Sequence, residues 1–72
     1  EQEEVSLDEK MVSVREYASQ HSTFRFSSLM KEQKGKIQMI VTFLAILELM
    51  KTGELLVVQE QLFDDMLITS RI

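Results

Sequence analysis

Residues 36–53 read KIQMIVTFLAILELMKTG, and this stretch decides the fold. No helix breaker interrupts residues 36–51, so they predict a helix of about 24 Å at 1.5 Å per residue. Gly35 breaks the pattern before this helix, and Gly53 supplies a left-handed stop after it. Lys51 suits the negative C-terminal end.

The predicted helix is apolar nearly all round, so no continuous solvated face remains. At about 100° per residue, one side is expected to form the core, and Leu44→Ala is expected to destabilise the fold. This predicted core face comprises Ile37, Ile40, Val41, Leu44 and Leu47. A neighbouring stripe comprises Met39, Phe43, Ile46 and Met50, with Leu47 on the border.

The stripe has two interpretations. A domain of this size has too little material to surround an apolar helix, and exposed Met and Phe suit a protein-binding surface. We therefore predict that the stripe binds a partner, through Met39, Phe43, Ile46, Leu47 and Met50. The alternative is that the rest of the domain covers the stripe as ordinary core.

Three elements are predicted before this helix. Ser6 and Glu9 have the spacing of a capping box, which predicts a helix over residues 7–19. Apolar and polar residues alternate at the end of residues 21–26, which predicts a brief strand, and residues 29–33 predict a short helix. The candidate N-caps of that short helix are Ser27 and Ser28.

After Gly53 the apolar pattern changes to that of strands. Residues 55–58 and 66–68 are apolar runs separated by a polar interval, which predicts two antiparallel strands joined by a loop. The order helix, strand, helix, helix, strand, strand is that of a small winged-helix domain of the α+β class. We expect residues 1–6 to be a linker or frayed lead-in and residues 7–72 to be the domain.

Length and composition limit the functions available. The chain has 72 residues, of which 44% are hydrophobic and 28% charged, so it predicts one small globular domain. There is no cysteine, which excludes disulfides and thiolate sites. A net charge of -4 disfavours nucleic acid, and no segment predicts a membrane span or a secretion signal. The chain starts with Glu1 and not Met, so we expect a piece of a longer protein.

Few residues suggest catalysis or a cofactor. His21 is the single histidine and has no neighbouring metal ligand, so a solvated or capping role is expected. Asp64 and Asp65 are adjacent and would point apart in a strand, so they do not form an acid/base pair. Lys31, Lys34 and Lys36 lack a phosphate-loop pattern and are interpreted as a solvated turn. We expect no enzyme, metal or cofactor.

The chain resembles the C-terminal winged-helix domain of a bacterial kleisin, segregation and condensation protein A. Three motifs carry the resemblance, which covers about residues 7–69. The motifs are VTFLAILELMKTG at residues 41–53, VVQEQ at residues 57–61 and FDDMLI at residues 63–68. Asp64 stands where we would expect glycine in the family, so the turn there differs.

This resemblance implies a partner and a location. A kleisin of this family bridges the subunits of a structural-maintenance-of-chromosomes (Smc) complex, and its C-terminal domain binds one Smc ATPase head. A middle region, absent from these residues, binds segregation and condensation protein B. The resemblance thus implies a role in chromosome condensation and segregation, in the cytoplasm at the nucleoid, without direct binding to nucleic acid or membrane.

Two other functions compete with this interpretation. The domain could be a DNA-binding winged helix of a transcription regulator, if Arg25, Lys31, Lys34 and Lys36 formed one basic face. It could also be a homodimerisation module, in which the apolar stripe packs against the same stripe of a second copy.

Overall fold

A computed structural model describes residues 6–59 and 66–71 of the chain. The elements in these residues are α1 (Leu7–Gln20), β1 (Thr23–Arg25), α2 (Phe26–Lys31), α3 (Lys36–Lys51), β2 (Leu55–Gln59) and β3 (Leu67–Ser70). This order and the antiparallel sheet confirm the predicted winged-helix-like α+β fold. The predicted lead-in lies outside the described residues except for Ser6.

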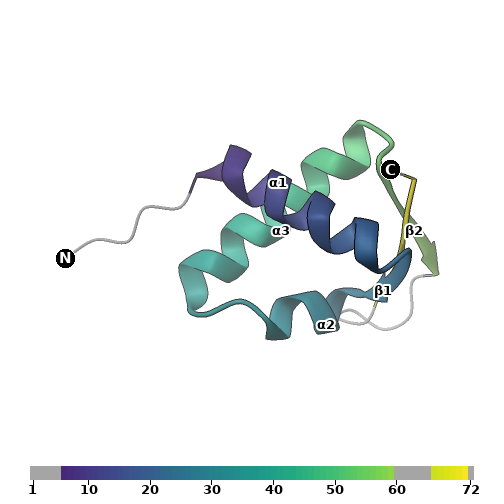
Figure 1. Cartoon of the computed structure of the whole chain (residues 1–72). Coiled ribbons are helices and arrows are strands. Elements are labelled where there is room, and N and C mark those ends of the chain that lie inside the picture. The colour runs from purple at the N-terminus through teal and green to yellow at the C-terminus, as the bar shows by residue number, and fades with distance from the viewer. Residues whose placement is uncertain (1–5, 60–65, 72) are drawn as a thin grey trace.

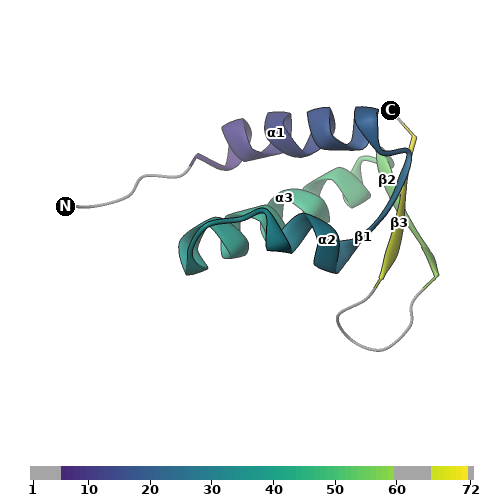
Figure 2. The same ribbon diagram turned by 60° about the horizontal axis from the view of Figure 1, so that its bottom comes forward.

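Helices α1 and α3 lie side by side, and the sheet packs at the end of this pair (Figure 1). Figure 2 shows α1 above α2 and α3, with the three strands at the right-hand end. No helix in the described ranges is long and apolar enough to cross a membrane.

The last strand of the chain lies in the middle of the sheet. The strand order is β1-β3-β2, and both pairings are antiparallel. Ile68 on β3 pairs with Phe24 on β1 and with Val57 on β2. The register of β2 against β3 shifts between Val57 and Gln59, so Val58 is the extra residue of a β-bulge.

The starts of the first two helices are held in different ways. The Glu9 amide donates to Ser6 Oγ at 3.3 Å, which confirms the predicted N-cap of α1. The second helix starts at Phe26, three residues before its predicted start at Leu29. The Phe26 amide donates to the Met66 carbonyl at 2.9 Å, so a bond to the strand end replaces a side-chain cap. The predicted caps Ser27 and Ser28 are inside the helix, and that prediction was wrong.

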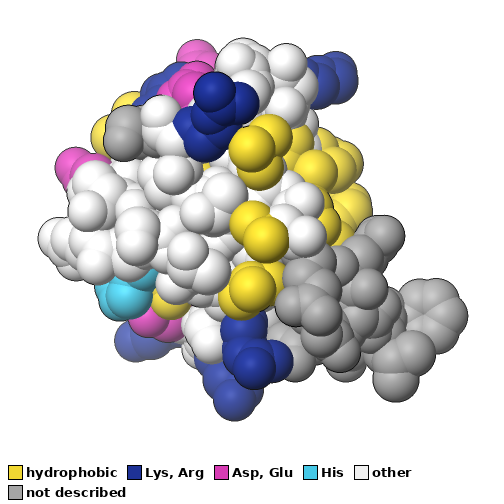
Figure 3. All heavy atoms as spheres, turned by 90° about the vertical axis from the view of Figure 1, so that its right-hand side faces the viewer, with side chains coloured by type: hydrophobic (Ala, Val, Ile, Leu, Met, Phe, Trp, Pro, Cys, Tyr) yellow, Lys and Arg dark blue, Asp and Glu magenta, His cyan; other side chains and the backbone are white. Residues whose placement is uncertain are grey.

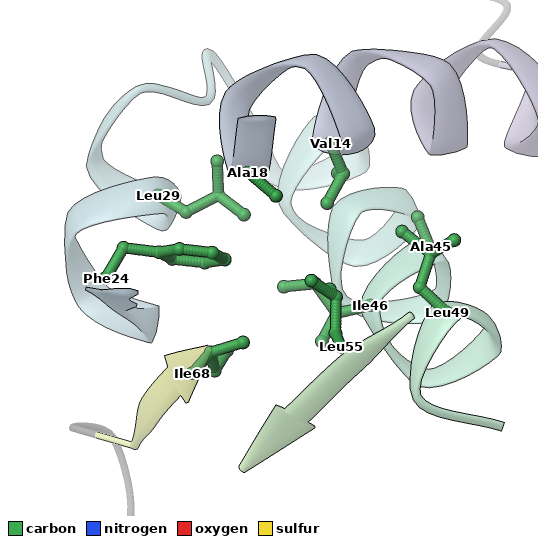
Figure 4. Close-up of a cluster of buried hydrophobic side chains, with 9 residues drawn as sticks. All are labelled: Val14, Ala18, Phe24, Leu29, Ala45, Ile46, Leu49, Leu55 and Ile68. Atoms are coloured by element: carbon green, nitrogen blue, oxygen red, sulfur yellow. The ribbon is translucent and has the colours of Figure 1, made fainter. Parts of the chain in front are cut away.

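The core forms where the helices meet the sheet. Its buried side chains point toward one another in Figure 4. They are Val14, Ala18, Phe24, Leu29, Ala45, Ile46, Leu49, Leu55 and Ile68. Each of the six elements therefore contributes at least one side chain to a single core.

The predicted core face of α3 was wrong. The buried residues of α3 are Thr42, Ala45, Ile46 and Leu49. Leu44 is 44% exposed, and Ile37, Ile40 and Leu47 are exposed as well. Only Val41 of the predicted set is half-buried.

Two of the four buried residues of α3 have short side chains. Thr42 and Ala45 are fully buried in the helix that makes most of its contacts with α1. Short side chains at a helix contact let the two helices approach closely. The Thr42 hydroxyl donates to the Gln38 carbonyl at 2.7 Å, so its burial leaves no unpaired polar group.

Candidate functional site

The side of α3 that faces away from α1 and the core is exposed and apolar. Phe43 and Leu47, two residues of the predicted stripe, are 42% and 40% exposed. Monomeric proteins rarely expose several large apolar side chains along one helix unless another molecule covers them. Figure 3 shows hydrophobic side chains gathered in a band on the sheet end of the molecule.

A groove runs between α3 and the strands of the wing. Its volume is about 570 Å³. The lining side chains are Phe43, Ile46, Leu47, Met50, Val57, Val58 and Met66. We call this the wing groove. The described residues of this lining are apolar, and they include Met50 and Met66, whose flexible side chains adapt to different surfaces.

The β-bulge shapes the wing side of this groove. In a regular strand Val57 and Val58 would point to opposite faces, because side chains alternate. The bulge at Val58 breaks the alternation, so both side chains line the groove. Val58 is 58% exposed, the highest value for a large apolar side chain in the described residues. The predicted partner-binding residues did not include these valines, although residues 55–59 were the alternative surface, because nothing in that stretch marks a bulge.

Ile46 does not belong to the exposed surface. It is 1% exposed and forms part of the core, although it also lies at the floor of the wing groove. The prediction of Ile46 as an exposed partner-binding residue is therefore corrected: its side chain is a core residue. Met50 is half-buried and packs against the core with one side.

Met39 lies in a second hollow, apart from the wing groove. This hollow has a volume of about 350 Å³ and lies between α2 and α3. Its lining residues are Phe26, Ser27, Met30, Lys31 and Met39. We call it the α2–α3 hollow. The rings of Phe26, which lines the hollow, and Phe43, which lines the wing groove, meet edge to face with centroids 6.0 Å apart. The structure therefore divides the predicted stripe into two sites.

The predicted lysine cluster is also divided. Lys31 lines the α2–α3 hollow. Lys34 instead lines a polar depression on the side of α1, together with Lys10. Lys10 Nζ donates to Gln33 Oε1 at 3.0 Å and to Gln38 Oε1 at 2.7 Å, which ties α1 to α3. Lys31 and Lys34 therefore line different depressions, and Lys36 lines neither of them.

The single histidine, His21, lies at the C-terminal end of α1, where a solvated or capping role was predicted. The His21 ring stacks on Tyr17 at 4.2 Å between centroids, and its Nδ1 lies 3.0 Å from the Tyr17 carbonyl at the end of α1. Within residues 6–59 and 66–71, no three His, Cys, Asp or Glu side chains gather into a metal-binding group. Asp64 and Asp65 lie outside the described residues.

An ion pair joins α1 to the turn after α3. Arg15 Nε donates to Glu54 Oε1 at 2.7 Å, and Arg15 Nη2 donates to Glu54 Oε2 at 3.2 Å. The Arg15 guanidinium holds the pKa of the Glu54 carboxyl below its ordinary value, and a hydrogen bond from the Thr52 hydroxyl acts in the same direction. The ionised form of Glu54 is thus favoured by folding.

This ion pair predicts a loss of stability in acid. Because the pKa of Glu54 is lower in the folded than in the unfolded state, its contribution is complete above the unfolded value and is lost as pH falls through the folded value. Urea unfolding of Glu54→Gln should give a lower free energy of unfolding at neutral pH and a smaller decline between about pH 5 and pH 3. An equal decline in the parent and Glu54→Gln would contradict this. Glu16→Gln, which removes an exposed carboxylate of α1, is the control.

Comparison with known proteins gives the family. The chain matches the sequence profile described as segregation and condensation protein ScpA over residues 1–71. Segregation and condensation protein A of Brevibacillus brevis is 36% identical over 66 residues, which are 92% of this chain and 26% of that protein. The protein of the same name from Streptococcus mitis is 35% identical over 69 residues, covering 96% of this chain and 28% of the relative.

A third relative, segregation and condensation protein A of Halothermothrix orenii, is 36% identical over 73 residues, covering 99% of this chain and 30% of the relative. The chain thus spans between a quarter and a third of the length of these relatives. The name of the family refers to segregation and condensation and to no enzymatic reaction. The match extends over both the helices and the wing, and the chain belongs to the family of segregation and condensation protein ScpA.

Proposed function

We propose that this domain is a protein-interaction module that binds the ATPase head of an Smc protein through the wing groove. The observation that carries the proposal is the continuous exposed apolar surface made by Phe43 and Leu47 on α3 and by Val58 on β2. A domain of this size leaves that surface in water unless a partner covers it. Family membership supports an Smc protein as the partner.

The chemistry of the groove suits a protein surface better than a small molecule. Its lining is apolar and contains methionine and phenylalanine, which are enriched in the centres of protein interfaces. Among the described residues, the lining offers no polar side chain that could orient a substrate. Binding would then depend on shape and on removing apolar area from water.

The whole protein extends the proposal beyond this chain. As a kleisin, it would connect two Smc subunits during chromosome condensation and segregation, in the cytoplasm at the nucleoid. A region outside these residues would bind segregation and condensation protein B. For the residues of this chain, the proposal names one partner, the Smc head, and one binding surface, the wing groove.

The direct test is calorimetric titration of the isolated domain into a purified Smc ATPase head from the same organism. The result expected is one domain bound per head with a negative heat-capacity change, which is the mark of apolar burial. Absence of binding with both proteins at about 100 μM would overturn the proposal. It would mean that the binding free energy is weaker than about -5.5 kcal/mol. Sedimentation of the domain alone checks that the groove does not pair with its own copy.

DNA binding is the alternative function, and the scarcity of exposed polar and basic side chains along α3 disfavours it. A helix that reads the major groove needs side chains that donate to base edges and phosphates. The charged residues exposed on α3 are Lys36 and Lys51 at its two ends, and Lys51 already pairs with Glu48 at 3.4 Å. We predict no binding of duplex DNA in fluorescence anisotropy at physiological salt. Sub-micromolar affinity with a steep salt dependence would instead favour the transcription-regulator interpretation.

A further inference from the structure

The α2–α3 hollow is a separate depression that the proposed Smc interface does not use. It shares no lining residue with the wing groove. Its walls are the phenyl ring of Phe26 and the thioether side chains of Met30 and Met39. Met39 is 42% exposed, so the hollow is open to a partner. An apolar side chain placed there would leave water and meet flexible methionines that adapt to its shape.

The rim of the hollow is positively charged. Lys31 is one of its lining residues. Lys36 lies one turn before Met39 on α3, so the two side chains are neighbours on the helix surface. In the described part of the chain no acidic side chain lines the hollow. The carboxylate nearest to it in sequence, that of Glu32, lines the depression on the α1 side instead. Among the described residues, the lining therefore supplies no carboxylate that would neutralise the charge of Lys31.

We propose that the α2–α3 hollow binds a short acidic segment of a partner protein, with one bulky apolar side chain inserted between Phe26, Met30 and Met39. Carboxylates on either side of that apolar residue would meet Lys31 and Lys36. The apolar contact supplies most of the affinity, and the two charges set the orientation and the preference for acidic segments.

Two other occupants fit the hollow less well. A phosphate backbone matches the charge of the lysines but has no apolar group for the cavity. A second copy of this chain could offer Leu7, which is exposed and followed by Asp8 and Glu9 at the start of α1. Such a contact joins two different surfaces, so it would continue from copy to copy and appear as open-ended association.

The test uses the isolated domain and short synthetic peptides, followed by NMR of backbone amides and methionine methyl groups. The first peptide has a central phenylalanine with two glutamates on each side. The second has serine in place of phenylalanine, and the third has lysines in place of the glutamates. Lys31→Glu and Met39→Ser alter the hollow, and Val12→Ser makes the same kind of change at an exposed apolar residue of α1.

The first peptide is expected to shift the signals of Met30 and Met39, and to bind about tenfold more tightly than the serine peptide. Lys31→Glu should weaken it about threefold or more, with a reduced dependence on salt, and Met39→Ser should weaken it further. Val12→Ser should have no effect. Capture of the Smc head by Lys31→Glu should be unchanged, so the two sites can fail independently.

Three results would overturn the inference. The first is equal binding of the phenylalanine and serine peptides. The second is a preference for the lysine peptide or for duplex DNA over the acidic peptide. The third is self-association of the domain in sedimentation that Lys31→Glu abolishes, since this would assign the hollow to a second copy.

Discussion

Leu49→Ala is expected to lower the free energy of unfolding by about 2 to 5 kcal/mol, the range for a leucine deleted from a closed core. Leu49 is fully buried on α3, in the core that also contains Leu55 of β2 and Val14 of α1. A domain of this length has a total stability of about 4 to 10 kcal/mol, so the loss is a large share of it. Thermal melting should show a fall of about 10 °C or more.

Leu44→Ala is the matched control for this substitution. It removes the same atoms from the same helix, but from a side chain that is nearly half exposed. Its expected cost is about 1 kcal/mol or less, because little area returns to water and no cavity is left. Equal losses for the two variants would mean that α3 is rotated relative to the arrangement described here.

Leu47→Arg is expected to weaken capture of the Smc head by about 100-fold or more while leaving the domain folded. The Leu47 side chain is exposed in the free domain, so the guanidinium can stay hydrated there. In a dry interface the same charge would lose its hydration without a counter-ion. Phe43→Arg should act in the same direction, although it also removes the ring contact with Phe26.

Two controls make the capture experiment decisive. Ile46→Arg places a charge in the core and should unfold the domain, whereas Val12→Arg changes an exposed residue of α1 and should affect neither folding nor capture. Circular dichroism measures folding and a pull-down with the purified head measures capture. Full capture by a folded Leu47→Arg variant would remove the wing groove from the interface.

The order of the elements could be predicted from the sequence because the signals were local. Ser6 at the start of α1, Gly53 after α3 and the change from helical to strand periodicity each depend on a few neighbouring residues. The start of α2 could not be predicted in this way. It depends on a hydrogen bond from Phe26 to Met66, which lies 40 positions later in the chain.

The face of α3 that is buried could be predicted only in part. When nearly every position is apolar, hydropathy does not distinguish one side of a helix from the other. The buried face includes the small or polar residues Ala45 and Thr42, while the more hydrophobic Leu44 remains exposed, so hydropathy did not indicate which side faces the core. Phe43 and Met39 of the predicted stripe are exposed, and so is Leu47, which had been placed on the border with the core face. The role of these residues in binding stays a prediction.

The central position of β3 has a consequence for how the domain forms during synthesis. Residues 67–70 leave the ribosome after the other two described strands, yet β1 and β2 have no other strand to pair with in the described sheet. Ile68 also completes the core from that strand. The helices can therefore form early on a nascent chain, but the sheet and the wing side of the groove require residues 67–70 to be synthesised. A translating ribosome would hold a domain that cannot yet engage a partner, and engagement would begin only after β3 has emerged.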